Sequence, residues 1–235
     1  MTSANSSKFF APCPRGLEQV LVDELVKLNA GNPESLQGGV SFVGSFDLCY
    51  QVNLVSRIAN RVLWEISHGP YCNEEDIYRA AFSLPWPSWF GVKNRIKVNI
   101  NSKNCPLRSL DFLTLRVKDA ICDHFRKVVG ARPNIDTRMP DIGIYVFLDH
   151  STITFYLDTT GTPLFKRGFR GNVSEAPLRR NLAAGILRIA GWTPNHVLLD
   201  PMCGSGTFLL EAAQIAENIA PGLGRHFAFE KFHHF

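Results

Sequence analysis

The sequence predicts an α+β protein that changes to an α/β pattern in its last third, and three observations support this fold class. Up to about residue 158, apolar side chains alternate in short strands that lie between amphipathic helices. Beyond that point a helix, a continuous apolar run, a glycine-containing loop and another helix follow directly on one another. The excess positive charge of the chain is concentrated in residues 91–138.

Composition limits the classes of protein to which the chain can belong. Its 235 residues suffice for one large domain or roughly two to three small ones. Apolar residues make up 45% and charged residues 20%, which is typical of a folded globular protein. No apolar run approaches the roughly 20 residues of a membrane span, and the polar opening MTSANSSKFF does not resemble a secretory signal. We therefore expect a cytoplasmic protein with no membrane partner.

The six cysteines are scattered and form no Cys-x-x-Cys pair or Cys/His cluster at zinc spacing, so no metal site is predicted. The first five are expected to be buried free thiols. The sixth stands apart because of its glycine-rich neighbours. In chain order, the six cysteines are Cys13, Cys49, Cys72, Cys105, Cys122 and Cys203.

Charge is unevenly distributed along the chain. Residues 1–90 carry 6 basic and 9 acidic side chains, a net charge of −3, whereas residues 91–138 carry 11 basic and 4 acidic ones, a net charge of +7. Such a segment would recruit an anionic partner such as a nucleic acid. A solvated charged face explains the same composition, and charge alone does not separate the two interpretations.

The first unit is predicted to contain two helices and two strands. Helical spacing of apolar residues extends over 17–28 and ends before Gly31 and Pro33. A strand follows at 40–43, and Ser45 is a suitable cap for the next helix. The side chains of that helix expected to point inward are those of Phe46, Cys49, Tyr50 and Leu54. A strand in which Val62, Trp64 and Ile66 alternate with polar residues ends the unit near residue 70.

The second unit follows the order helix, strand, helix, strand, strand. Asn73 is predicted to cap a helix with an acidic first turn. A strand over 96–100 has one apolar and one cationic face. A long amphipathic helix over 113–128 and two strands over 142–148 and 153–157 complete it. The inward positions of that helix are predicted to be Leu113, Val117, Ala120, Ile121, His124 and Val128.

The third part reads as the opening of a doubly wound α/β domain. A helix ended by Gly191 is followed by Val197–Leu199, an apolar run typical of a buried parallel strand. The loop 200–206 then leads into another helix. The side chains predicted to face inward are Leu178, Leu182, Ile186 and Ile189 on the first helix, and Leu209, Leu210, Ala213 and Ile215 on the second.

The segment LLDPMCGSGTFLLEAA, residues 198–213, contains this loop and is the segment that we expect to bind a ligand. Gly204 and Gly206 allow a sharp turn and close approach to a ligand. The lysine of a nucleoside-triphosphate loop is missing, since Thr207 follows, and the third glycine of a dinucleotide loop is replaced by Leu209. A ligand with a carboxylate and no pyrophosphate remains, and S-adenosylmethionine fits, with its amino-acid end at the loop amides and Asp200.

Three segments resemble one known family. The first motif of class I methyltransferases of the THUMP-associated type is similar to DPMCGSGT, residues 200–207. The helix before that motif is similar to GNVSEAPLRRNLAAGIL, residues 171–187. The opening segment of these enzymes is similar to FFAPCPRGLEQVLVDEL, residues 9–25. LRVKDAICDHF and RPNID, residues 115–125 and 132–136, resemble the THUMP helix and the turn after it. The similarity extends over nearly the whole chain and is greatest for the RlmL type.

The resemblance implies three domains: a ferredoxin-like domain at 1–70, a THUMP RNA-binding domain at 71–158, and the incomplete beginning of a Rossmann-like class I methyltransferase domain at 159–235. The implied cofactor is S-adenosylmethionine. The residues implied to hold or shape its site are Asp200, Pro201, Cys203, Gly204, Gly206 and Thr207.

Further roles follow from the same resemblance. Candidates for phosphate contacts are Arg95, Lys97, Arg116 and Lys118, which would add salt-sensitive binding rather than sequence choice. Pro177 and Asn181 are candidates for cofactor contact or for packing. Glu211 matches an acid of the family, and a solvent-facing helical carboxylate is the alternative.

The implied activity is methyl transfer to the exocyclic N2 of a guanine in 23S ribosomal RNA. Family members that methylate amino groups carry an Asn/Asp-Pro-Pro-Tyr motif, and no Pro-Pro dipeptide occurs here. We therefore expect no catalytic residue within this chain and no activity of the chain alone. A non-enzymatic RNA-binding module and a transfer-RNA guanine-N2 methyltransferase remain as alternatives. Residues 1–158 are expected to fold independently of the remainder.

Overall fold

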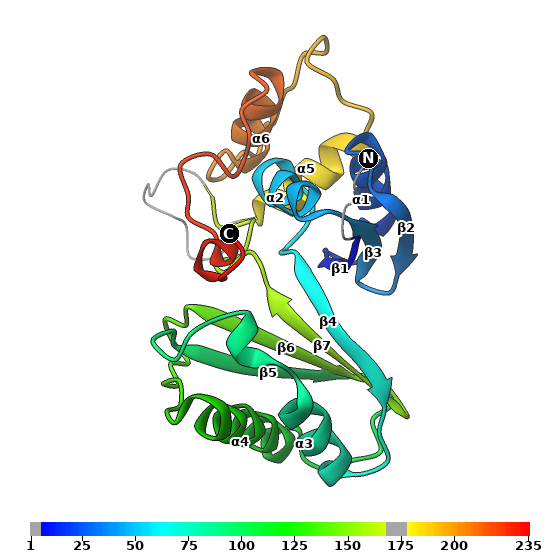
Figure 1. Cartoon of the computed structure of the whole chain (residues 1–235). Helices are drawn as coiled ribbons and strands as arrows, with labels where there is room; N and C mark the ends of the chain where they lie inside the picture. Colours follow the sequence, from blue (N-terminus) through cyan, green and yellow to red (C-terminus); the bar gives the residue numbers. More distant parts are fainter. Residues whose placement is uncertain (1–5, 168–177) are drawn as a thin grey trace. The chain divides into compact units, whose positions relative to one another are not determined.

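A computed structural model describes residues 6–167 and 178–235, which form two compact units (Figure 1). Unit 1 joins the chain up to Val62 with Thr162–His226. Unit 2 joins Leu63–Gly161 with Phe227–Phe235. Pro177, a predicted cofactor neighbour, lies outside the described residues.

The strands of unit 1 form an antiparallel group in which β3 (Gly39–Gly44) lies between β1 (Ser7–Pro12) and β2 (Gly31–Leu36). Only β3 was predicted. The sequence of β2, GNPESL, contains Gly and Pro, which are normally depleted in strands. They are tolerated because β2 is an edge strand with a register shift between Gly31 and Glu34.

Two helices cover this group. Helix α1 (Glu18–Lys27) was predicted, and so was α2 (Phe46–Val55), whose N-terminus is capped by Ser45 accepting a hydrogen bond from the backbone N–H of Leu48. The predicted inward face of α2 is partly wrong. Leu54 is 38% exposed, and Leu48 and Val52 are buried in its place.

Unit 1 also contains both helices of the last third, α5 (Arg180–Ile189) and α6 (Thr207–Ala216). Helix α5 packs against α1 and α6. Their predicted inward faces are wrong: Ile186, Ile189, Leu209 and Leu210 are exposed. On α5 the contact face consists mainly of small residues, because a wider side chain would not fit; the buried members are Asn181, Ala183, Ala184, Gly185 and Leu187.

The predicted strand at Val197–Leu199 is absent from the structure. Val197 is 96% exposed and Leu199 is 82% exposed. A parallel strand is stable only when neighbouring strands satisfy its backbone groups and helices cover its faces. No strand of the described residues pairs with this segment, so the apolar run stays in solvent.

Unit 2 contains a mixed sheet in the order β4-β7-β6-β5. Strand β7 (Thr152–Asp158) pairs antiparallel with both β4 (Leu63–Pro70) and β6 (Ile142–Leu148), and β5 (Ile96–Ser102) pairs parallel with β6. The alternation predicted for β6 is confirmed, because Ile142, Ile144, Val146 and Leu148 are all buried. The strand predicted to close the first unit, β4, is part of this sheet.

The helices of unit 2 lie on one side of its sheet (Figure 1). Helix α3 (Glu74–Ser83) begins with the predicted Asn73 cap, which forms a capping box with Asp76. Helix α4 (Leu110–Val129) connects the parallel strands β5 and β6. Its predicted inward face is confirmed except at the C-terminal end, where Val128 is 59% exposed and Phe125 is buried. Two short 3-10 helices, η1 (Trp86–Ser88) and η2 (Ala228–Lys231), complete the unit.

Candidate functional site

The candidate cofactor loop, residues 200–206, turns tightly into the N-terminus of α6. Gly204 and Gly206 have φ angles of 52° and 68°, a left-handed conformation that strains any residue with a side chain. The backbone N–H of Gly206 donates to the carbonyl oxygen of Cys203 at 2.7 Å, and that of Met202 donates to Asp200 Oδ1 at 3.2 Å. The predicted requirement for glycine at both positions is thus met by the local geometry.

The start of α6 presents positively polarised backbone amides. Its N-cap, Gly206, has no side chain to occupy them, and the first turn contains no acidic residue. A ligand carboxylate placed there is stabilised by about 0.3–1 kcal/mol from the helix dipole. The hydroxyl oxygens of Ser205 and Thr207 lie 3.0 Å apart beside these amides.

The structure brings the six predicted cofactor residues together in one turn. Pro201, Cys203 and Gly204 are exposed, Asp200 and Gly206 are half-buried, and Thr207 is buried. The loop is therefore accessible on its outer side and is supported from within at Thr207. Which of its atoms touch a cofactor remains a prediction.

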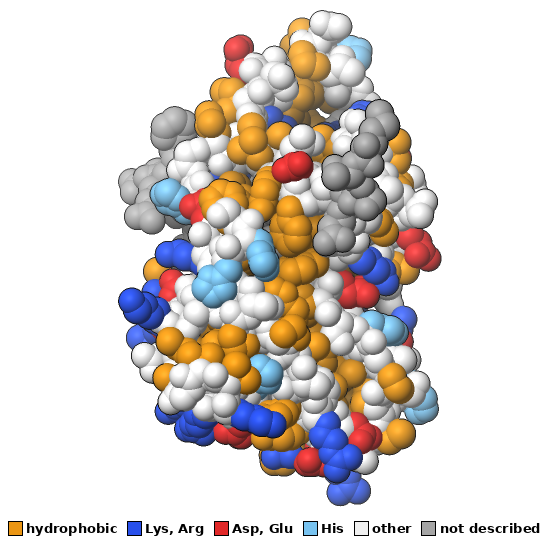
Figure 2. Space-filling view, viewed as in Figure 1, with side chains coloured by type: hydrophobic (Ala, Val, Ile, Leu, Met, Phe, Trp, Pro, Cys, Tyr) orange, Lys and Arg blue, Asp and Glu red, His pale blue; other side chains and the backbone are white. Residues whose placement is uncertain are grey.

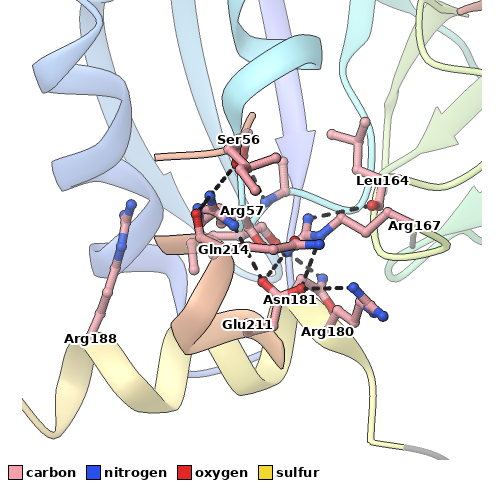
Figure 3. Close-up of polar contacts among 12 residues, drawn as sticks. Ser56, Arg57, Leu164, Arg167, Arg180, Asn181, Arg188, Glu211 and Gln214 are labelled. Atoms are coloured by element: carbon pink, nitrogen blue, oxygen red, sulfur yellow. Dashed lines mark hydrogen bonds and ion pairs between the residues drawn. The ribbon is translucent and has the colours of Figure 1, made fainter. Parts of the chain in front are cut away.

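Glu211 lies one turn after Thr207 and is fully buried, so the solvent-facing interpretation is wrong. Its carboxylate accepts a hydrogen bond from Arg167 Nη2 at 2.8 Å. Nη1 of Arg57 lies 3.6 Å and Nη1 of Arg180 lies 3.7 Å from its oxygens (Figure 3). Glu211 therefore acts within the protein interior as the common ion-pair partner of three arginines.

Asn181 is also buried and also has partners within the protein. Its Nδ2 donates to the carbonyl oxygen of Ile58 at 3.1 Å and to Oδ1 of Asn60 at 2.8 Å. The side chain thus holds the loop after α2, and these hydrogen bonds favour the packing interpretation over cofactor contact.

Sequence reasoning did not identify Arg57 and Arg167 as members of this cluster. They are separated from Glu211 by 154 and 44 positions, so no local spacing connects them. One usable signal is the placement of Arg57 in the segment Ser56–Asn60, beside the buried residues Ile58 and Ala59. A charged residue in such surroundings needs a partner.

Two of the candidate RNA-contact residues, Arg95 and Lys97, hold the segment before β6. Arg95 Nη1 lies 2.9 Å from Asp136 Oδ2, and its Nε lies 3.2 Å from Asp141 Oδ2. Lys97 Nζ donates to the carbonyl oxygen of Thr137 at 3.2 Å. Backbone hydrogen bonds to Asp136 and the charge of Arg95 keep the pKa of that carboxyl below its usual value.

The other two, Arg116 and Lys118, lie on α4. Arg116 Nη2 is 2.6 Å from Glu75 Oε2, and its guanidinium lies 4.3 Å from the ring centroid of Tyr78. Lys118 Nζ is 2.7 Å from Asp119 Oδ1. Figure 2 shows the same mixture of blue and red side chains over the part of unit 2 that carries α3 and α4. A phosphate must therefore compete with an intramolecular partner at each of the four cations.

The cysteines only partly follow the prediction. Cys13, Cys49 and Cys122 are buried free thiols, but Cys72 is exposed and Cys105 is half-buried. Among residues 6–167 and 178–235, no group of three metal-ligating side chains is found. In the same described part of the chain, no helix is long and apolar enough to cross a membrane.

Comparison with family models identifies three domains in order. Residues 8–63 match the RlmL ferredoxin-like domain, residues 71–158 match the THUMP domain, and residues 167–234 match the RMKL-like methyltransferase domain of the UPF0020 family. The chain therefore contains a segment similar to the RlmL ferredoxin-like domain, a THUMP domain and a segment similar to a methyltransferase domain, in that order. The predicted fold class is confirmed.

Two curated proteins are similar to almost the whole chain. The chain is 42% identical over 225 residues to ribosomal RNA large subunit methyltransferase K/L from Psychromonas ingrahamii, and 42% identical over 230 residues to the protein of that name from Cellvibrio japonicus. These matches cover 95% and 96% of the chain but only 30% and 31% of the relatives. The chain thus spans about a third of the length of the curated relatives it matches.

Solved structures are also similar over nearly the whole chain. A predicted N6-adenine-specific DNA methylase from Listeria monocytogenes matches with a TM-score of 0.86 and 28% identity, over 97% of this chain and 60% of that one. SMU.472, a putative methyltransferase complexed with SAH, matches with a TM-score of 0.85 and 30% identity over the same shares.

Proposed function

We propose that the chain is part of an RNA methyltransferase that transfers a methyl group from S-adenosylmethionine to the exocyclic N2 of a guanine in 23S ribosomal RNA. The geometry of the loop 200–206 carries this proposal. It combines two left-handed glycines with a helix N-terminus that has no acidic residue in its first turn. It also lies within the segment that matches a methyltransferase domain.

The cofactor assignment follows from the chemistry of this loop. The amino-acid end of S-adenosylmethionine carries a carboxylate for the exposed amides of α6 and an ammonium group for the Asp200 carboxylate. SMU.472, whose structure contains SAH, supports the same cofactor. Residues Pro201 and Cys203 would shape the loop, and Thr207 would support it from beneath.

The RNA assignment rests on the THUMP domain and on the names of the two curated relatives. The net charge of +7 in residues 91–138 supplies attraction to phosphates. The particular choice of a guanine N2 comes from the resemblance to the RlmL type. A transfer-RNA guanine is the alternative substrate.

Methyl transfer itself requires a further part of the enzyme. The exocyclic nitrogen of guanine is a poor nucleophile, so it must be aligned with the sulfonium methyl by groups that hold the flipped base. No Pro-Pro dipeptide of the expected motif occurs in this sequence. We therefore propose that the loop 200–206 binds cofactor and that the chain alone does not transfer the methyl group.

Three measurements on the 235-residue chain test the proposal. Adding SAH should shift the amide resonances of residues 203–207, and a shift confined to other residues would contradict the cofactor assignment. RNA binding should weaken with salt and should favour a 23S fragment over a transfer RNA. Tritium transfer from labelled S-adenosylmethionine to either RNA by this chain alone would show that its catalytic groups are complete.

The second candidate function is that of a non-enzymatic RNA-binding module. The exposure of Val197 and Leu199 is the observation in its favour, since no strand within residues 6–167 and 178–235 pairs with this segment. This alternative predicts RNA binding without any SAH-induced shift in residues 203–207. The same titration therefore separates the two functions.

A further inference from the structure

Arg57 lies in the ferredoxin-like domain yet contacts the helix that follows the candidate cofactor loop. It comes directly after the C-cap of α2, and its side chain is 9% exposed. A buried guanidinium must be matched by acceptors, and all of those found for it belong to α6 and its C-terminal extension.

The backbone of Arg57 is fixed from the opposite side by Glu24 of α1. Glu24 is only 5% exposed, and its Oε1 accepts a hydrogen bond from the backbone N–H of Arg57 at 2.9 Å. Its Oε2 accepts from the Ser56 hydroxyl at 3.1 Å and from the backbone N–H of Ile58 at 3.3 Å. One carboxylate therefore orders the whole turn from which the arginine extends.

The guanidinium contacts α6 and its C-terminal extension at two separate positions along the helix axis. Nη1 lies 3.6 Å from Glu211 Oε2 in the second turn of the helix. Nη2 donates to the carbonyl oxygen of Gln214 at 3.0 Å and to that of Ile219 just beyond the helix end. The Gln214 carbonyl also accepts from the backbone N–H of Ile219 at 3.0 Å, so the second set of contacts ties Arg57 to the turn that ends α6.

These contacts restrict both the rotation and the axial position of α6. Glu211 and Thr207 are four residues apart, so they project from the same face of the helix. When Glu211 is held toward Arg57, Thr207 is turned inward as well, and the amides of Gly206 and Thr207 take a fixed direction. The carbonyl contacts at the other end prevent the helix from sliding along its axis.

Arg167 completes the arrangement (Figure 3). Its side chain is 3% exposed, and its Nη2 donates both to Glu211 Oε2 at 2.8 Å and to the carbonyl oxygen of Arg57 at 3.3 Å. Burial lowers the pKa of Arg57, and the neighbouring Glu211 carboxylate counteracts that shift. Buried ion pairs of this kind contribute little net stability compared with apolar packing, but they can specify one arrangement over others.

We propose that Arg57 is a positioning residue that sets the register of α6, and through it the geometry of the cofactor loop. The ferredoxin-like domain would then control cofactor affinity without touching the cofactor. The part of the inference that concerns affinity rests on the proposed function of the loop. The part that concerns loop geometry does not depend on any ligand.

The test compares the whole chain with Arg57→Met, which keeps an unbranched side chain but removes the donors. The control is Arg15→Met, because Arg15 is an exposed cation of the same unit. Hydrogen exchange should accelerate at least tenfold at the amides of Gly206 and Leu210, which are hydrogen-bonded to Cys203 and Gly206. Exchange in β1 and β3 should stay unchanged. Equal acceleration throughout unit 1, or none at the loop, would overturn the proposal.

Two further measurements keep the outcomes distinct. If the parent chain binds SAH, Arg57→Met should weaken binding at least tenfold and Arg15→Met should not. If the parent chain does not bind SAH, the proposed function fails, and the exchange data still decide on the positioning role. Should Arg57→Met not fold, Arg57→Lys keeps the charge without the forked donors, and the same exchange criteria apply to it.

Discussion

At the residue scale, Glu211 is a position that the sequence singles out, but its burial and its ion-pair partners could not be predicted from the sequence. The resemblance predicts an acid of the family at this position, one turn into the helix, but its partners Arg57 and Arg167 come from distant parts of the chain. Hydrogen bonds among such residues depend on how the chain folds back on itself. Local periodicity carries no information on that, so the motif was predictable and the ion-pair network was not.

We predict that Glu211→Gln destabilises the chain by about 3–5 kcal/mol, because it leaves buried guanidinium groups without their counter-charge. The exposed Glu217 at the end of the same helix provides the control, and Glu217→Gln should change stability by less than about 0.5 kcal/mol. Urea unfolding of both variants measures the difference. Equal stabilities would mean that the arginines find other acceptors.

The glycines of the loop allow a second prediction at this scale. Gly206→Ala forces a side chain into a left-handed conformation at a strain of about 1–2 kcal/mol, although no atom obstructs the new Cβ. Gly16 has a φ of 85° and equally open surroundings, so Gly16→Ala introduces the same strain away from the loop. We expect both variants to melt at lower temperature and only Gly206→Ala to lose SAH binding. Unchanged SAH affinity in Gly206→Ala would count against the loop as the cofactor site.

At the scale of elements, the strands and helices of unit 2 were predicted well and the helix faces of α5 and α6 were not. In unit 2, every predicted element finds its packing partner within the chain, so apolar periodicity and burial coincide. On α5 the buried face instead carries Gly185, where an added Cβ would lie 2.3 Å from a Leu17 methyl group. Small and polar residues make that contact, whereas Ile186 and Ile189 remain in solvent. Periodicity alone therefore selects the wrong face.

The connection after α6 provides a prediction about how these elements are joined. The backbone N–H of Gly222 donates to the carbonyl oxygen of Leu54 in α2, and an added Cβ would lie 2.7 Å from that oxygen and 2.8 Å from Leu54 Cα. Because backbone atoms cannot move aside as a side chain does, Gly222→Ala should cost about 1–3 kcal/mol. Gly69→Ala serves as the control, since no atom lies within 4 Å of its added Cβ. Chemical denaturation of the two variants should show a loss for Gly222→Ala alone.

At the scale of the whole molecule, the division into units differs from the expectation that residues 1–158 fold independently. Unit 1 joins residues up to 62 with residues 162–226, and Arg57, Asn181, Glu211 and Gly222 all connect the two parts. A cut after residue 158 would remove α5 and α6 and expose Leu17 beneath them. The sequence shows the change of pattern near residue 158, but not that the later helices pack on the first domain. That packing depends on buried polar contacts without a periodic signature.

The proposed RNA surface depends on several parts of the chain, since Arg95 precedes β5, Lys97 lies in β5 and the other two cations lie in α4. All four have intramolecular partners. Each phosphate contact contributes about 0.7–0.9 to the slope of log affinity against log salt. Arg95 has two carboxylate partners whereas Lys118 has one. Lys97 also holds the segment before β6 through the Thr137 carbonyl, so Arg95 and Lys97 would have to release residues 136–141 to bind a phosphate. The pair Arg116→Gln and Lys118→Gln should therefore lower the slope more than Arg95→Gln and Lys97→Gln.

The matched control for this comparison is Lys27→Gln with Lys166→Gln, which removes two exposed cations of unit 1 and changes the net charge of the chain equally. Titration of a 23S fragment over a range of salt concentrations gives the three slopes. If all three double variants lower the slope alike, the chain attracts RNA through its overall charge. A loss confined to the α4 pair would instead locate the phosphate contacts on that helix, because only local contacts release counterions from the bound strand.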